Sequence, residues 1–298
     1  SDQIQMQGGW GGGRVVGSLG LTFNNFSSKN IFKKGKWRPL PSGDGQRLSL
    51  RASSNGAYYQ NYNMSFTEPW LGGRKPTSLQ VSIYRSVSSN GLTNEERQEI
   101  QVSGLTLGIG QRLKNPDDYF TLYNGLNFVQ YKLNNSQSFF SFRDGESNNV
   151  NYNINIGRNS VDQLNFPRQG SNFLFSLKLS PPYSMFDDVD DYSKLTDQEK
   201  YEWVEYYKWK FKATWFSPFT DKLVLATRTE FGFLGAYNEE LGISPFERFY
   251  VGGDGLSGMG YMNDGRELVS LRGYSNNSLS AETGATIYNK YTAELRYA

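Results

Sequence analysis

The side chains that perform much of enzyme catalysis are missing from this sequence of 298 residues, which contains no histidine and no cysteine. Their absence removes disulfides, thiolate chemistry, histidine metal ligands and any nucleophile activated by imidazole. A site built from carboxylates or lysines is left open, but no spacing among these residues demands one. We therefore expect a protein that is not an enzyme, with no catalytic residue, no bound metal and no cofactor.

Three short patterns resemble ligand sites but have simpler interpretations. Gly253, Gly255 and Gly258 spell G-x-G-x-x-G, yet no strand precedes them and no helix follows, so they indicate a flexible loop. The acidic run Asp187–Asp191 could gather calcium, although a solvated loop is the better interpretation. The basic run Lys33–Arg38 is short, and the net charge of the chain is only 31 − 29 = +2. Nucleic acid is therefore not an expected partner.

Alternation of side chains is the main structural signal. No run approaches the roughly 18 apolar residues of a membrane helix, although aromatic residues make up 15% of the chain. In YKWKFKATW, Tyr207–Trp215, the aromatic residues and Ala213 share one face of an extended strand, and three lysines and Thr214 share the other. We expect the apolar face to meet lipid.

The pattern predicts twelve long strands, at residues 2–11, 14–24, 46–54, 57–67, 77–86, 99–112, 119–133, 148–158, 172–180, 205–216, 222–235 and 286–298. Compact turns near 67–76, 114–118 and 217–222 alternate with longer polar loops near 86–98, 134–149, 181–204 and 236–284. A soluble sandwich would also alternate, but long strands with short turns at one rim and long loops at the other favour an all-β, transmembrane antiparallel barrel.

Five stretches of the chain together resemble one family: QMQGGWGGG, SFTEPWLGG, NFPRQGSNFLFSLKLS, PFERFYVGG and SLRGY. They are similar to the barrel of the Omp85 superfamily, in particular its BamA-like outer-membrane insertases. That family carries an arginine motif, V/I-R-G-F/Y, near the tip of a long extracellular loop that folds back into the barrel. Arg272 and Gly273 match the motif outright, and Leu271 and Tyr274 are conservative replacements.

The resemblance implies a role for the arginine motif inside the barrel. A guanidinium presents five donors in a rigid fork and can hold the loop against a carboxylate on the inner wall. Glu294 is the expected partner of Arg272, because it lies on the polar face of the last strand, where the family places an acidic residue. Phe249, Gly252 and Gly253 would form the base of the loop.

The resemblance also assigns a role to the first strand. Glycine weakens strand pairing, because it adds backbone entropy and offers no side chain to pack. In the family, a weakly paired first strand is a lateral gate that templates an incoming strand by β-augmentation. Here that strand comprises Gln3, Ile4, Gln5, Met6, Gln7, Gly8 and Gly9.

The family barrel has about sixteen strands, and this chain supplies about twelve of them. We expect residues 1–298 to be a barrel segment with a plug-like loop at 236–284, and the family's periplasmic POTRA domains and final strands to be absent from this chain. Residues 254–270 separate the paired glycines from the arginine motif, whereas family members usually place the two close together. The role of this insertion is left open.

The expected function is the assembly and insertion of outer-membrane β-barrel proteins through a lateral gate, in the outer membrane of a Gram-negative-type bacterium. The implied partners are nascent barrel proteins, accessory lipoproteins of an assembly complex and outer-membrane lipids. An Omp85-type polypeptide secretion pore is the main alternative, and a passive porin or a membrane-embedded hydrolase is less favoured. The sequence does not identify the substrates, the accessory subunits or the state of the gate.

Overall fold

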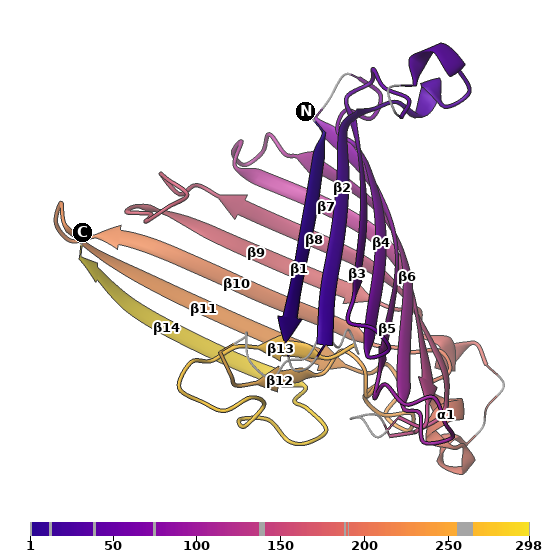
Figure 1. The fold of residues 1–298 in the computed structure, drawn as a ribbon. Coiled ribbons are helices and arrows are strands. Elements are labelled where there is room, and N and C mark those ends of the chain that lie inside the picture. Colours follow the sequence, from indigo (N-terminus) through magenta and orange to yellow (C-terminus); the bar gives the residue numbers. More distant parts are fainter. Residues whose placement is uncertain are drawn as a thin grey trace.

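One antiparallel sheet of twelve strands dominates the computed structural model, which describes residues 2–11, 14–37, 40–73, 76–136, 141–187, 189, 191–254 and 265–297 (Figure 1). Each strand pairs with its neighbour along the chain. The strands are β1 (Gln3–Gly11), β2 (Arg14–Phe26), β3 (Gln46–Ser54), β4 (Tyr59–Glu68), β5 (Thr77–Ser89), β6 (Glu99–Arg112), β7 (Phe120–Asn134), β8 (Gly145–Asn159), β9 (Gly170–Leu179), β10 (Tyr207–Pro218), β11 (Leu223–Gly235) and β14 (Ile287–Tyr297).

The two edges of this sheet are β1 and β14. Within the described residues neither edge pairs with a further strand, so the curved sheet is a partial barrel. Two more short strands, β12 (Phe249–Val251) and β13 (Glu267–Val269), pair in parallel within the connection from β11 to β14.

Helical structure in the described part of the chain is limited to single turns. They are η1 (Ser28–Asn30), η2 (Lys34–Lys36), η3 (Tyr183–Met185), η4 (Tyr192–Lys194) and α1 (Asp197–Lys200). Among the residues that the structure describes, no helix is long and apolar enough to span a bilayer.

The strand register sorts side chains into apolar and polar rows. One row of directly opposed residues across eight strands is entirely apolar: Ile4, Leu21, Leu50, Met64, Ile83, Leu105, Phe128 and Val150. The adjacent row is entirely polar: Gln3, Thr22, Ser49, Ser65, Ser82, Thr106, Asn127 and Asn151. A slip of one residue would exchange the two faces, so burial of the apolar rows in lipid specifies the register.

The polar face is the inner face of the curved sheet. Thr106 Oγ1 donates to Asn127 Oδ1 at 2.9 Å, and Asn127 Nδ2 donates to Asn151 Oδ1 at 2.9 Å. In β10, Lys208 is 1% exposed on this face, while Trp209 and Trp215 on the outer face are 37% and 48% exposed. The facing predicted for residues 207–215 is confirmed.

The connections differ between the two ends of the sheet. At one end, here called the short-turn end, residues 69–76, 113–119, 160–169 and 219–222 join the strands, and both chain termini lie there. At the other, the long-loop end, the connections include 90–98, 135–144, 180–206 and 236–286. The alternation predicted from the sequence holds for most connections, but residues 27–45 form a long connection at the short-turn end and residues 55–58 a short one at the long-loop end.

The twelve predicted strands are all present, with ends shifted by a few residues. The largest shifts extend strands towards the long loops. For example, β5 continues to Ser89 and β8 begins at Gly145, where GESN lacks an alternating pattern and pairing with β7 keeps the chain extended. The ribbon of β12 and β13 was not expected, because three-residue strands inside a loop carry too few residues to show a period.

Candidate functional site

The connection between β11 and β14, residues 236–286, folds inward against the polar face of the sheet; we call its described part, 236–254 and 265–286, the plug loop. It ties the short ribbon of β12 and β13 to the wall strands β9, β10 and β14 by side-chain contacts. The inward folding predicted for this loop is confirmed.

A cluster of five charged side chains holds the plug loop on the wall. Lys178 of β9 lies 3.0 Å from the Glu247 carboxylate, and Lys210 of β10 lies 2.7 Å from that of Glu267. Lys208, between them on β10, binds both carboxylates, at 2.8 Å for Glu247 and 2.6 Å for Glu267. The wall therefore supplies the cations and the loop supplies the anions.

The two loop carboxylates are kept ionised by this arrangement. Burial alone would raise the pKa of Glu247, but Lys178 and Lys208 outweigh it and hold that pKa well below its ordinary value. The pKa of Glu267 is lowered in the same way, with burial opposed by Lys208 and Lys210. Buried charges are costly unless they are paired and hydrogen-bonded. Removing either the lysines or the glutamates would therefore strongly destabilise the attachment of the loop to the wall.

Glu247 also has an unusual backbone. Its φ is +67°, in the left-handed region that residues with a Cβ seldom adopt. Lys208 Nζ donates to the backbone carbonyl of the same residue at 2.7 Å, and this contact helps to hold the strained conformation. Strain maintained by surrounding contacts is common where a segment must be held in one position.

A second charged group lies one step further along the wall. Glu230 of β11 is 3.3 Å from both Lys212 of β10 and Lys290 of β14. Lys290 also donates to the backbone carbonyl of Ser270 at 2.8 Å. The segment just before the arginine motif is thereby attached to β14.

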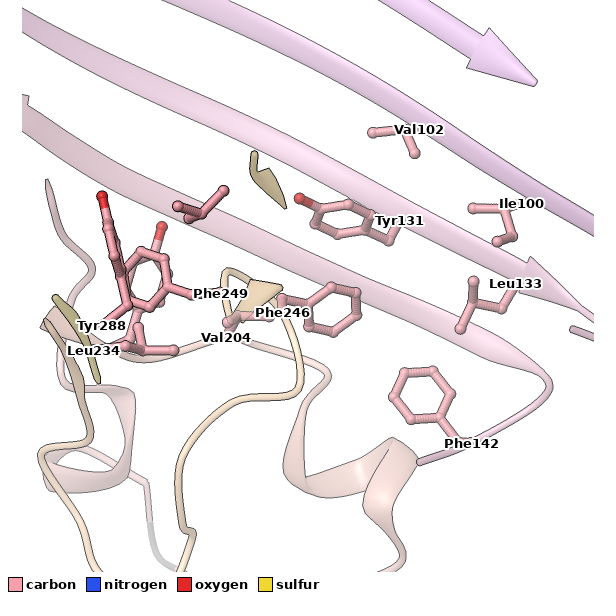
Figure 2. Close-up of a cluster of buried hydrophobic side chains, with 12 residues drawn as sticks. Ile100, Val102, Tyr131, Leu133, Phe142, Val204, Leu234, Phe246, Phe249 and Tyr288 are labelled. Carbon is pink, nitrogen blue, oxygen red and sulfur yellow. The ribbon is translucent and has the colours of Figure 1, made fainter. Parts of the chain in front are cut away.

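Apolar contacts complete the attachment (Figure 2). The loop residues Phe246 and Phe249 are fully buried and face wall residues of the strands. Phe246 stacks on Tyr131 with ring centroids 4.5 Å apart, and Phe249 meets Tyr288 edge-on at 4.7 Å. Lys208 lies 4.6 Å from the Phe249 ring centroid, which adds a cation–π contact to its ion pairs.

The loop base requires glycine at two positions. Gly252 and Gly253 have φ of +126° and +88°. A Cβ on Gly252 would collide with the Ser275 carbonyl oxygen, and one on Gly253 with the Asn276 side chain. The backbone must pass too close to the 271–278 turn for any side chain to fit.

The arginine motif forms a turn around Gly253. Leu271 N donates to the Gly253 carbonyl at 2.8 Å, and Gly253 N donates to the Tyr274 carbonyl at 3.0 Å. Gly273 has φ of +89° with open space around it, so glycine there serves the turn itself. Tyr274 is 51% exposed.

The predicted pair between Arg272 and Glu294 is not formed in this structure. Glu294 binds Arg296 on its own strand at 3.0 Å, while Arg272 is exposed and has no ion pair within the described residues. The motif reaches β14 at the level of Lys290, and Glu294 lies four residues beyond, about 13 Å along the strand. The loop is too shallow to bring the two charges together.

The predicted gate strand is the most exposed strand of the sheet. All of Gln3–Trp10 is exposed, with Ile4 72%, Met6 78% and Trp10 75% exposed. Gly8 lies directly opposite Gly17 of β2, so no side chains pack across the pair at this point. A Cβ at Gly8 or Gly9 would meet nothing within 4 Å, which means that these glycines are not needed for space.

Sequence reasoning missed the residues that hold the loop. The sequence shows Lys208 and Lys210 only as part of a cationic face and gives no local reason to select Glu247 or Glu267, although Glu247 lies in the PFERFYVGG stretch. The available signal was a strand with three lysines on a face that should line a polar lumen. Such a row needs carboxylates from elsewhere in the chain.

The glycine and acidic patterns yield no further site among the described residues. Gly255, Gly258, Asp188 and Asp190 lie outside the described residues. At the ends of the acidic run, Tyr192 donates to Asp187 at 2.6 Å, and Asp191 pairs with Lys194 at 2.9 Å. Both carboxylates thus have partners within their own loop.

The fold and the site together define a membrane β-barrel whose inner wall holds a folded-in loop. The sequence matches the Omp85 superfamily domain over residues 42–298, and the chain belongs to this superfamily. The structure is similar to that of BamA from Haemophilus ducreyi lacking POTRA domains 1–3, with a TM-score of 0.65 and 19% identity. The match covers 99% of this chain and 52% of that one, so the chain spans about half the length of its structural relative. Curated proteins gave no significant sequence match.

Proposed function

We propose that this chain is the barrel segment of a BamA-like insertase in the outer membrane of a Gram-negative-type bacterium. The observation that carries the proposal is an asymmetry in the sheet. The contacts that hold the plug loop come from β5, β6, β7, β9, β10, β11 and β14 and from the loop residues Phe142, Val204 and Tyr206, whereas β1, which carries Gly8 and Gly9, contributes no residue to this cluster or to these ion pairs within the described part of the chain. The proposal places the opening seam on the β1 side, away from the strands that hold the loop.

The free edge of β1 suits strand templating. An edge strand presents unpaired N–H and C=O groups, which cost several kcal/mol each in hydrocarbon. An incoming strand that pairs with β1 removes that cost and buries its own apolar face in lipid. Gly8 and Gly9 offer no side chain to a strand that closes against this edge, which lowers the cost of separating the two, because little side-chain contact is lost.

The mechanism is non-covalent and needs no nucleotide or bond-making group. Its substrates are nascent outer-membrane barrel proteins, and accessory lipoproteins of an assembly complex are its proposed partners. In the proposed membrane orientation, the short-turn end faces the periplasm and the long-loop end faces the outside of the cell, as is usual for barrels of this kind.

The test is to lock the seam in the full-length protein. Because the chain contains no cysteine, a disulfide between position 5 of β1 and the strand that closes against it can be introduced without interference. Oxidation should stop the insertion of a substrate barrel, and reduction should restore it. A matched control disulfide joins positions 5 and 20, which are directly opposed in β1 and β2, and should leave insertion intact. Normal insertion with a fully locked seam would reject the proposal and favour the polypeptide secretion pore.

A further inference from the structure

The connection between β2 and β3, residues 27–45, is the longest connection at the short-turn end, and the proposed function does not use it. It contains five lysines and arginines and one aspartate, a net charge of 5 − 1 = +4, while the whole chain carries +2. The rest of the chain is therefore at 2 − 4 = −2. The positive charge is concentrated in this segment.

The described part of the segment is folded. Ser27 is fully buried, its hydroxyl donates to Asp44 at 2.6 Å, and it accepts from the Asn30 backbone at 3.2 Å. The Trp37 indole donates to the Ile31 carbonyl at 3.1 Å. Asp44, the sole acid of the segment, is thus used internally.

What the fold leaves outside is cationic and aromatic. Lys29, Lys33 and Lys36 are exposed and have no ion pair within the described residues. Phe32 is 94% exposed and Trp37 47% exposed beside them. Exposed apolar and cationic side chains in one short segment are typical of a surface that lies at a membrane interface, with rings among the lipid headgroups and ammonium groups on phosphates.

The position of the segment agrees with such a partner. It projects beyond the strand ends at the short-turn end, where the outer apolar rows of β2 and β3 finish (Figure 1). The neighbouring turn exposes Trp70 and Leu71, 56% and 42% exposed. Aromatic side chains at a barrel rim mark the level of the headgroups.

We infer that residues 27–45 bind the headgroups of anionic phospholipids in the leaflet at the short-turn end, next to the first strands of the barrel. The lysines provide the preference for anionic headgroups, and the rings of Phe32 and Trp37 insert among those headgroups. The Asn24 backbone donates to the Asp2 side chain at 3.2 Å, so the segment begins beside the start of β1. This contact joins the start of β1 to the strand that leads into the segment.

A label on the segment tests the inference in the full-length protein. Gly35 is exposed, its Cβ would meet nothing within 4 Å, and the chain has no cysteine, so Gly35→Cys can carry a fluorophore. The protein is placed in phosphatidylcholine nanodiscs doped with a headgroup quencher attached either to phosphatidylglycerol or to phosphatidylcholine. Quenching by the phosphatidylglycerol probe should be several-fold stronger.

Matched variants identify the source of that preference. Lys33→Gln with Lys36→Gln should remove most of it, whereas Lys114→Gln with Lys222→Gln, exposed lysines in other turns of the same end, should preserve it. Phe32→Ala should reduce quenching by both probes and leave their ratio unchanged. Equal quenching by the two lipids, or an unchanged ratio in the Lys33/Lys36 variant, would overturn the inference.

Two further outcomes distinguish other ligands. Soluble inorganic phosphate should not displace the quenching; displacement would show a free-phosphate site instead. A label that stays in water in both lipid mixtures would also overturn the inference and would point to an acidic protein as the partner of the segment.

Discussion

Lys208 of β10 binds Glu247 of the plug loop twice, through its carboxylate at 2.8 Å and its backbone carbonyl at 2.7 Å. The lysine side chain is 1% exposed and the glutamate 12% exposed. A single buried ammonium group thus pairs with the carboxylate of one loop residue and also holds the strained backbone of that residue. Because the same lysine also binds Glu267, it joins the two halves of the loop on either side of residues 255–264.

Replacing Lys208 by Met should release the plug loop. Each glutamate would keep one lysine, but the loss of a partner from a buried ion pair costs about 3 to 5 kcal/mol. The measurement is the labelling rate of a cysteine placed at Val269, which is 5% exposed. Labelling should accelerate strongly in Lys208→Met and little in Lys212→Gln, whose side chain is 51% exposed. Equal acceleration in both would show that Lys208 has no special role.

Acid should loosen the loop in the wild-type protein. The pKa values of Glu247 and Glu267 are lowered from the ordinary 4.5, so their contribution is complete above that value and is lost as the pH falls through their lower folded-state pKa values. The mobility of a spin label at position 274 should rise as the pH is lowered below about 4.5 and stay constant between neutral pH and that value. In the double variant that combines Glu247→Gln and Glu267→Gln, the label should be mobile at every pH. A pH response that survives in this variant would assign the switch to other groups.

Arginine at Phe211 should destabilise the barrel by about 2 to 4 kcal/mol, because this position faces lipid near the middle of β10. The inner-face change Thr214→Gln on the same strand should cost little, since polar side chains line the lumen. The stability of the heat-modifiable folded form against denaturant measures both. Similar losses in the two variants would contradict the assigned faces.

Valine at Gly8 should slow insertion. The site has open space around it, and removing a strand glycine stabilises pairing by about 0.5 to 1 kcal/mol, which corresponds to about two- to fivefold in rate if opening of this edge limits insertion. Gly17→Val in β2, which strengthens only the pairing of β1 with β2, should leave the rate unchanged, as should Ser65→Val in β4. Substrate insertion into proteoliposomes by the full-length protein provides the rate. Faster insertion in Gly8→Val would refute the gate assignment.

A double-mutant cycle of Arg272→Ala and Glu294→Gln should be additive, because the structure places Arg272 in solvent and Glu294 beside Arg296. The cycle between Glu294 and Arg296 should show a small coupling of about 0.2 to 1 kcal/mol, as expected for an exposed pair. Plug-loop opening and barrel stability are the readouts. Strong coupling between Arg272 and Glu294 would mean that the loop reaches deeper along β14 than the structure shows.

Local sequence patterns are sufficient to predict the sheet. Period-two alternation, as in Lys208 to Trp215, depends only on the geometry of an extended chain, so strand number, strand length and the face that meets lipid could all be predicted from local patterns. The requirement for glycine at Gly252 and Gly253 was also visible as a paired motif, although its cause was not. The family resemblance correctly indicated that the loop folds inward.

The contacts that hold the loop join residues far apart in the sequence, and they become visible in the folded protein alone. Lys178 and Glu247 are 69 residues apart, and Lys210 and Glu267 are 57 apart; no local pattern pairs residues at such separations. Glu294 looked like the best carboxylate for Arg272 because both face the lumen, but the strand carries it about 13 Å past the point that the loop reaches. Alternation specifies which face a side chain occupies, whereas the depth of a folded-in loop depends on contacts that form only when distant strands come together.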